Sequence, residues 1–547
     1  MMRKKTKEPH EHNAVYRAVD GWFCLSKRGT NIKTEIFAGI LMFLEVVCMA
    51  AVSAQLITNS ASAFIKSYTT VYFGIMLVSC IGTVLMGLVC NAPLIQSVSM
   101  SGVILIASTL SGSYGLTPAN VLLLALIANG AYLLVTLIPP ARRFFANAVP
   151  AQIKKALPAA MGAYLLIFAL TQLNVFGSEA NNFSSVLEKM AAAGDALPWW
   201  GVVVPLFGLN NADGLGWYMM AAIITAIVGV GLAMILQARK RKHAVILAFA
   251  FTVIVYVALW AIRGNFMDYY YYAFMTPAYG GMYFYDSVPR ISSEFNAALV
   301  LKSITEGLDF TKYEAYQRYL ESKALGVPMT EVTVDVTGKL ILIGVTTVLS
   351  FLALGVSETA TGIHASAYAS NAYDEDGEIV YKQNPHFGKV GKFLNVYTVN
   401  ALSSVTGCLL GGGPVMVRGE SAVGGKEGGK TGLAALISGL LCGAALFTVA
   451  FSGLFMNGIA LFGILIFVAL CLLRGLERCD FTDSASALPF IATVAAAAVT
   501  QNLGVAVLLG VIMDTVTKLF SGKAKEIHAG TYILSVLAIG LYVLTKI

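Results

Sequence analysis

Residues 424–431 read GGKEGGKT and match the phosphate-loop pattern G-x-x-x-x-G-K-[ST] at every position. In a true phosphate loop the backbone N–H groups and the lysine cradle phosphates, while the final hydroxyl reaches Mg²⁺. That chemistry needs a loop between a buried strand and a helix in a soluble α/β domain. The flanking sequence is apolar and has no such alternation, so we expect Lys430 and Thr431 to bind no nucleotide.

A second set of reactive side chains consists of ionisable residues inside apolar stretches: Glu45, Glu358, Arg418, Glu420 and Asp514. A charge at membrane depth costs at least ~2.5 kcal/mol on insertion scales, so a functional role is the first hypothesis for each. Carboxylates in such places suit proton binding and release. Glu420 follows a proline- and glycine-rich break, and Glu358 lies in the polar notch SETATG of an apolar run.

Each of these residues also has a structural interpretation. Arg418 and Glu420 could form a neutralising ion pair, although side chains two positions apart diverge on a regular helix. Glu45 could lie at a helix contact, and we interpret Asp514 as a capping or loop-proximal residue. We expect His364 to be a packed polar side chain, because the six histidines are scattered and no nucleophile or metal cluster is evident. The sequence therefore predicts no metal site and no enzyme activity.

The composition places these residues in a membrane. Of the 547 residues 57% are hydrophobic and 12% charged, against roughly 25% charged in soluble domains. Apolar runs of about the ~20 residues that cross a bilayer recur along the chain and predict about fourteen transmembrane segments. The formal charge of +7 comes from basic residues between these runs, as the positive-inside rule predicts, so no nucleic-acid partner is expected.

The runs divide the chain into four parts. Residues 1–35 are polar and predict a cytoplasmic N-terminal tail, and 36–262 hold the first seven spans. Residues 263–337 form an extracytoplasmic insert, and 338–547 hold spans eight to fourteen. The end is ambiguous, because 484–519 fits either one broken span or a short hairpin turning at Gln501 and Asn502.

Two candidate spans, the third and the tenth, are short and polar: NAPLIQSVSMSG at 91–102 and GPVMVRGESAVG at 413–424. Proline removes a backbone donor and glycine weakens a helix, so each should be a short extended piece followed by a half helix. Irregular backbone at membrane depth is tolerated only inside protein or beside a wet cavity. Interruptions at corresponding positions of two halves point to the site of a secondary transporter. Two proline-kinked structural helices are the alternative.

Three stretches carry a family resemblance: KTEIFAG at 33–39, AVPAQIKKA at 148–156 and GESAVGGKEGGKTGL at 419–433. They resemble the AzgA-like hypoxanthine/guanine permeases, a divergent branch of the nucleobase–cation symporters, from about Trp22 onward and apart from the insert. The resemblance implies the uracil-permease fold, an all-α polytopic protein of the inner cell membrane with two inverted seven-span repeats. Spans 1–4 and 8–11 would form a core domain and the others a gate. The apparent phosphate loop then joins a half helix to the next span, with Lys430 where the family usually has arginine.

By this resemblance Glu358 and Glu420 match the acidic residues that hold the base in the eighth and tenth spans. The implied substrate-binding set is Ser99, Met100, Glu358, Thr359, Gly419, Glu420 and Ser421. The set implied for proton coupling or charge balance is Glu45, Glu358, Arg418 and Glu420. The third span keeps Met100 but lacks the family's proline and asparagine. The family has aspartate at Glu358, a small polar residue at Glu45 and an aromatic or apolar residue at Arg418.

We therefore expect a proton- or cation-coupled symporter of a purine nucleobase such as xanthine, guanine or hypoxanthine, working by alternating access without cofactor or ATP. The alternative is an anion carrier of the same fold, resembling sulfate permeases or carrying urate or an anionic purine, which Arg418 would favour. The expected partners are the purine-like molecule, the coupling H⁺ or Na⁺ and the bilayer. A homodimer is an option.

Overall fold

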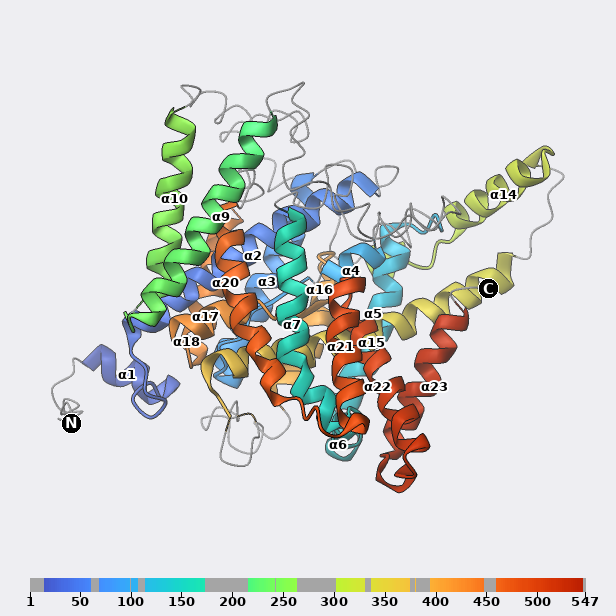
Figure 1. The fold of residues 1–547 in the computed structure, drawn as a ribbon. Helices are drawn as coiled ribbons and strands as arrows, with labels where there is room; N and C mark the ends of the chain where they lie inside the picture. The colour runs from blue at the N-terminus through green and yellow to red at the C-terminus, as the bar shows by residue number, and fades with distance from the viewer. Residues whose placement is uncertain are drawn as a thin grey trace.

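The structure is a computed structural model that describes residues 14–60, 68–98, 100–106, 114–172, 215–241, 243–262, 302–329, 336–373, 379, 394–446 and 459–544. Long helices packed against one another make up most of it (Figure 1). Within these residues six helices are long and apolar enough to cross a membrane, and five shorter apolar helices accompany them. The chain is therefore a helical, membrane-type protein, and the count of fourteen spans stays a prediction.

The helices follow the apolar runs of the sequence. The first half contains α1 (Ala14–Phe23), α2 (Ile32–Ser60), α3 (Tyr68–Cys90), α4 (Met100–Ile104), α5 (Pro118–Leu137), α6 (Pro139–Ala148), α7 (Ala151–Gln172), α9 (Leu215–Ala238) and α10 (Ala244–Ile262). The second half contains α15 (Val336–Ser370), α16 (Val396–Leu409), α17 (Ser421–Glu427), α18 (Gly432–Ala445), α20 (Ile459–Leu473), α21 (Ser484–Thr500), α22 (Leu503–Phe520) and α23 (Ala529–Leu544). Between the halves lie α13 (Lys302–Thr305) and α14 (Thr311–Leu325).

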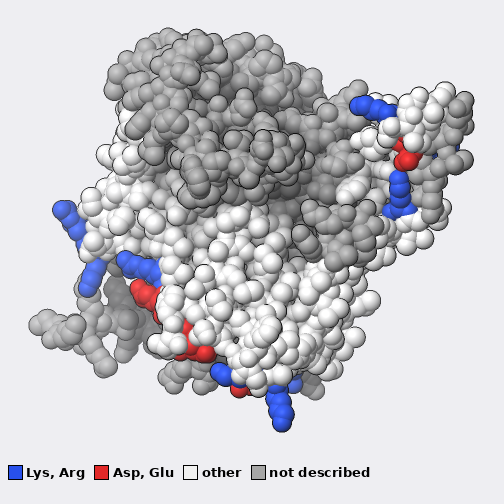
Figure 2. All heavy atoms as spheres, turned by 45° about the vertical axis from the view of Figure 1, so that its right-hand side comes forward, with Lys and Arg blue, Asp and Glu red and all other residues white. Residues whose placement is uncertain are grey.

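The surface agrees with a membrane setting. Figure 2 shows a broad uncharged area on the described part of one face, with charged side chains along its lower edge and on the projection at the upper right, which contains α14 of Figure 1. Large apolar side chains such as Leu134, Ile254 and Val536 are more than 60% exposed on the outside of the helices. An exposed apolar belt of this kind fits contact with lipid.

Small residues allow three of the helices to approach closely. A Cβ atom on Gly87 of α3 would lie 2.6 Å from the carbonyl oxygen of Gly432 at the start of α18. A Cβ atom on Gly39 of α2 would lie 2.7 Å from the carbonyl oxygen of Ala434. Glycines at helix crossings let backbones come together in membranes, where hydrophobic association is weak. The helices α2, α3 and α18 thus form one unit that borders both broken segments.

The interruptions expected in the third and tenth spans are present in the structure. Strand β1 (Gln96–Val98) precedes α4, and strand β2 (Val415–Val417) precedes α17. The two strands pair antiparallel, with Gln96 opposite Val417 and Val98 opposite Val415. Proline, which has no N–H donor, stands shortly before each strand. Segments more than 300 residues apart thereby satisfy each other's backbone inside the protein.

The ambiguous C-terminal stretch is a hairpin. Helices α21 and α22 pack against each other along their lengths. Gln501 takes a left-handed conformation with φ of 49°, and the side-chain oxygen of Asn502 caps α22 by accepting the Val505 N–H at 3.1 Å. A left-handed residue followed by a capping asparagine ends one helix and starts the next.

The expected insert is described only from residue 302 onward, and residues 263–301 lie outside the described part. Two carbonyl oxygens of its described end, those of Gly307 and Asp309, accept hydrogen bonds from Asn120 Nδ2 at 2.8 Å each. Gln317 of α14 donates to the Tyr114 carbonyl at 3.2 Å. These contacts hold the end of the insert on the N-terminal end of α5. The four-part division of the chain stays a prediction.

Candidate functional site

Hydrogen bonds fasten the start of β1 to the junction between β2 and α17. The hydroxyl of Ser421 accepts the Ile95 N–H at 2.9 Å and donates to the Arg418 carbonyl at 2.6 Å. The Arg418 N–H donates to the Ile95 carbonyl at 2.9 Å. Every one of these groups is buried, so the bonds fix the second segment against the first.

Arg418 and Glu420 form an ion pair in the same place. Nη2 of Arg418 contacts Oε1 of Glu420, and Nη1 donates to the Val98 carbonyl at 3.4 Å. The neutralising ion pair that the sequence left open is present: Arg418 lies before α17 and Glu420 occupies its N-cap, so the divergence of side chains on a regular helix does not apply. Glu420 Oε2 is buried and has no hydrogen-bond partner.

Glu45 of α2 is a third charge-bearing residue of this cluster. Its side chain is 1% exposed, and neither carboxylate oxygen has a hydrogen-bond partner. The charges of Glu420 and Arg418 both act on it electrostatically. A buried carboxylate without hydrogen bonds is costly unless it binds a proton or a cationic or hydrogen-donating ligand. The three unpartnered oxygens, two on Glu45 and one on Glu420, therefore mark a place able to receive such a group.

Glu358 and Thr359 approach the paired segments from α15. Both are buried, and the charge of Glu358 acts on Arg418. Asn400 of α16 donates through Nδ2 to the Thr359 hydroxyl at 2.9 Å, and Gln96 of β1 donates through Nε2 to Asn400 Oδ1 at 3.3 Å. A polar chain thus runs from α15 through α16 to the first broken segment. Gln96 Oε1 stays without a partner.

Sequence reasoning missed Gln96 and Asn400. Each is a buried amide inside an apolar segment, a signal that also drew attention to the acidic residues. Amides carry no charge, however, and their cost in a membrane is smaller than that of an ionised group, so they stand out less.

The remaining expected site residues are placed as follows. Gly419 lies against Met161 of α7, so closely that a Cβ atom would collide with the Met161 side chain. Met100 begins α4 directly after β1. Ser99 lies outside the described residues, as does the side chain of Met100. Six of the seven expected binding positions therefore lie on the two broken segments or on the stretch of α15 beside them.

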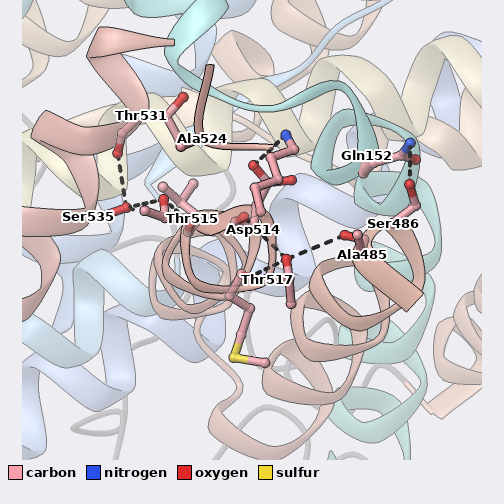
Figure 3. Close-up of polar contacts among 12 residues, drawn as sticks. Gln152, Ala485, Ser486, Asp514, Thr515, Thr517, Ala524, Thr531 and Ser535 are labelled. Atoms are coloured by element: carbon pink, nitrogen blue, oxygen red, sulfur yellow. Dashed lines mark hydrogen bonds and ion pairs between the residues drawn. The ribbon is translucent and has the colours of Figure 1, made fainter. Parts of the chain in front are cut away.

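Asp514 and His364 lie apart from this cluster. Asp514 is fully buried in the interior of α22, where it pairs with Lys518 at 2.7 Å, so the expectation of a cap or loop position is wrong. Figure 3 shows Asp514 beside the Thr515–Ser535 hydroxyl contact, 2.8 Å long, that links α22 to α23. His364 lines a pocket that is described below. In the described part of the chain no group of three or more His, Cys, Asp or Glu residues could hold a metal ion.

The stretch that matches a phosphate loop is occupied by a carboxylate of the chain itself. Glu35 Oε1 accepts the Lys430 N–H at 2.9 Å, and Oε2 accepts the Thr431 and Ala434 N–H groups at 3.4 and 3.2 Å. The first four N–H groups of a helix lack partners within it, and an acidic side chain there stabilises the helix start. Glu35 thereby satisfies the donors that would face a phosphate.

Comparisons with known proteins bear on this arrangement. No protein-family model matches the chain. The guanine/hypoxanthine permease GhxP of Escherichia coli O157:H7 is 24% identical over 526 residues, which cover 96% of each chain. The guanine/hypoxanthine permease PbuO of Bacillus subtilis (strain 168) is 22% identical and covers 94% of this chain and 98% of its own. The adenine permease AdeP of Escherichia coli (strain K12) is 27% identical over 183 residues, 32% of this chain and 41% of its own.

Among solved structures, the transmembrane domain of the cyanobacterial bicarbonate transporter BicA overlaps with a TM-score of 0.44 and 13% identity, over 87% of this chain and 97% of that domain. The sequence relatives are permeases and not enzymes. The resemblance indicated by the three sequence stretches is thus confirmed: the chain is a divergent relative of guanine/hypoxanthine permeases over nearly its full length.

Proposed function

We propose that the protein is a secondary active transporter that carries a purine nucleobase together with a proton or another cation. The observation that carries this proposal is the cluster beside the paired strands: Glu420, with an unused buried oxygen, contacts Arg418, and the charges of both act on Glu45 of α2. The full-length similarity to guanine/hypoxanthine permeases supports the nucleobase as cargo. The protein would lie in the inner cell membrane with its N-terminus in the cytoplasm.

In this proposal the base lies between the paired segments and α15, held by Glu420 and Glu358. The edge of guanine offers the N1–H and an exocyclic amine as parallel donors, which carboxylate oxygens accept. Oε2 of Glu420 is the oxygen left for this bond, because Oε1 contacts Arg418. The remaining members of the binding set would surround the bound base; they are Ser99, Met100, Thr359, Gly419 and Ser421.

Glu45 is the carboxylate that we assign to the coupling proton. Neither of its oxygens has a hydrogen bond, and its neighbour Glu420 repels a second negative charge. Arg418 balances one of the acidic charges, and a bound proton balances another. The loaded site is then nearly neutral, which lowers the cost of moving it across the bilayer.

Alternating access would follow from motion of the core, spans 1–4 and 8–11, against the remaining gate spans. The tight contact of Gly419 with Met161 of α7 is one point where a core segment meets a gate helix. A glycine at this position permits close approach, and a sliding contact between these two surfaces opens the site to one side at a time.

An anion carrier is the second candidate, and Arg418 is the observation that bears on it. A guanidinium free to contact substrate would select an anion. Here Arg418 contacts Glu420, and its second terminal nitrogen reaches the Val98 carbonyl. The arginine is therefore used by the protein itself, which favours a neutral purine as cargo.

Uptake into liposomes made with the purified protein tests the assignment. We expect radiolabelled guanine, hypoxanthine or xanthine to accumulate without ATP, and the accumulation to disappear when the proton and sodium gradients are both collapsed. Sulfate and urate added outside should compete weakly. Accumulation of sulfate in place of purines would support the anion carrier, and uptake that needs ATP would contradict both.

A further inference from the structure

A half-open pocket lies where α5, α6 and α7 meet α15 and α16, and no residue of the two broken segments lines it. Its empty volume, counted out to its mouth, is about 670 Å³. Leu352, Val356 and Ala360 line it at a spacing of four residues, so one stripe of α15 forms a wall. Most of the lining surface is apolar.

Basic side chains gather at one end of this pocket. Arg142 of α6 and Lys154 near the start of α7 line it together with His364 of α15. His364 lies twelve residues beyond Leu352 on the same helix, which places the two ends of the wall roughly 18 Å apart. Partial burial and the neighbouring Arg143 lower the pKa of Arg142. A guanidinium nevertheless stays charged at neutral pH. The pocket is thus long, apolar and positively charged at one end.

The surroundings of the pocket are those of a lipid contact. Leu134 and Ile138, at the end of α5 beside the lining residues Val135 and Thr136, are 65% and 52% exposed. The short helix α6 carries Arg142 and Arg143 next to Phe144, a combination typical of segments that lie at the membrane interface. Basic loops mark the cytoplasmic side, whose leaflet holds the acidic lipids.

We propose that this pocket binds an acidic phospholipid, with the phosphate at Arg142 and Lys154 and an acyl chain along Leu352, Val356 and Ala360. Basic pockets between transmembrane helices on the cytoplasmic side bind acidic headgroups, and each basic side chain near such a surface contributes about a fivefold factor in affinity. The apolar wall, which a soluble anion would leave uncovered, favours a lipid over free phosphate. None of the lining residues belongs to the set assigned to the nucleobase.

The chain offers a matched control for the charges. Arg142 and Lys154 line the pocket, whereas their immediate neighbours Arg143 and Lys155 are exposed and do not. The double variants R142Q/K154Q and R143Q/K155Q remove the same charge from the same loop. A third variant, Val356→Trp, fills the apolar wall and leaves every charge in place.

The experiment measures lipid retained by the purified, delipidated protein after mixing with equal amounts of phosphatidylglycerol and phosphatidylcholine of identical acyl chains, read by native mass spectrometry. We expect wild type and R143Q/K155Q to retain phosphatidylglycerol preferentially. R142Q/K154Q should lose that preference by about 25-fold, from two fivefold factors. Val356→Trp should retain less of both lipids. Size-exclusion profiles and thermal unfolding in detergent identify any variant that is misfolded.

Three results would overturn the proposal. The first is equal preference for phosphatidylglycerol in wild type and R142Q/K154Q. The second is an equal loss in both double variants, which would indicate a general surface charge effect. The third is displacement of the retained lipid by inorganic phosphate alone, which would make the pocket a soluble-anion site. None of these outcomes depends on nucleobase transport. The lipid site and the proposed transport function can therefore be tested independently of each other.

Discussion

From Pro93 to Ile104 the first broken segment carries no charged residue, whereas the second, from Pro414 to Glu427, carries four. Their backbones follow the same plan of proline, three-residue strand and short helix. The first segment contributes backbone groups of Ile95 and Val98 to their contact, while its Gln96 side chain donates to Asn400 of α16. The second contributes the Arg418–Glu420 pair and the bridging Ser421 hydroxyl.

The two segments share a backbone plan but differ in charge, so the need for a broken backbone can be considered separately from the need for charged side chains. Both segments must be broken, because each strand needs the other to satisfy its backbone inside the membrane. Only one of them needs to carry charge. We therefore expect substitutions in the second segment to change the uptake rate and its pH dependence. Equivalent substitutions in the first segment should change only the positions of the residues around the site.

The largest effect is expected for Glu420→Gln, with Glu358→Gln close behind. Each change keeps the shape of the side chain and removes a negatively charged acceptor. A hydrogen bond to a charged group is worth roughly 1.5–3 kcal/mol, so initial uptake rates in proteoliposomes should fall by a factor between about 12 and about 150.

Folding is the control for this pair of variants. The size-exclusion profile of both should match wild type, since neither change adds volume. Glu45→Gln is a useful third variant: it should abolish proton-driven accumulation while preserving exchange of labelled for unlabelled base. Normal uptake by both Glu420→Gln and Glu358→Gln would place the substrate elsewhere.

The broken segments and the acidic residues were predictable because their signals are local. A proline in a short polar span predicts a break in the helix, and a glutamate in an apolar run indicates an ionisable residue inside the membrane. The partners were not predictable in the same way. Gln96 meets Asn400 across 304 positions, and Glu35 meets Lys430 across 395, and no local pattern reports such pairings.

Arg418 and Glu420 show a second limit of prediction from sequence, which is the position where a helix begins. Their separation of two residues predicts divergence only on a regular helix, and where the helix starts decides whether that rule applies. Start positions are the least certain part of any reading of a sequence, since helix ends differ by a residue or two even between assignments of one structure. The same difficulty explains the wrong placement of Asp514, which lies inside α22 and not at its end.

The next largest effect is expected for Arg418→Ala, which removes the counter-charge of the second segment. A carboxylate that loses its cation holds a proton more tightly, so the pH optimum of uptake should move upward. Uptake at neutral pH should fall by about tenfold, and thermal stability should fall too, because breaking a buried pair leaves a charge uncompensated. Uptake measured from pH 5 to 9 gives the optimum.

Substrate preference is the decisive control for Arg418→Ala. The order among hypoxanthine, xanthine and urate should stay as in wild type if the arginine balances charge. A switch from anionic towards neutral purines at an unchanged pH optimum would show that the guanidinium contacts the substrate. In that case the anion carrier becomes the better assignment.

A smaller effect is expected for Gln96→Leu in the uncharged segment. The change keeps the size of the side chain but removes the hydrogen bond to Asn400, worth about 0.5–1.5 kcal/mol. The KM for the base should rise two- to tenfold while the maximal rate changes little. Ser97→Ala removes the contact with Ser79 on the other face of the strand and should change KM less. A loss as large as that of Glu420→Gln would remove the distinction between the two segments.

The smallest effect is expected for Lys430→Ala, at the end of the second segment where the phosphate-loop pattern lies. The backbone of Lys430 is held by Glu35 at its N–H and by Arg28 at its carbonyl, and both contacts survive loss of the side chain. Uptake should therefore stay within about twofold of wild type and independent of ATP.

Glu35→Ala is the contrasting variant, because it removes the acceptor of three N–H groups. It should destabilise the start of α18 by about 0.5–2 kcal/mol, which is measured as a lower Tm in detergent. Binding of Mg²⁺-ATP to the purified chain, lost in Lys430→Ala and kept in Glu35→Ala, would reverse this expectation and restore a nucleotide to the loop.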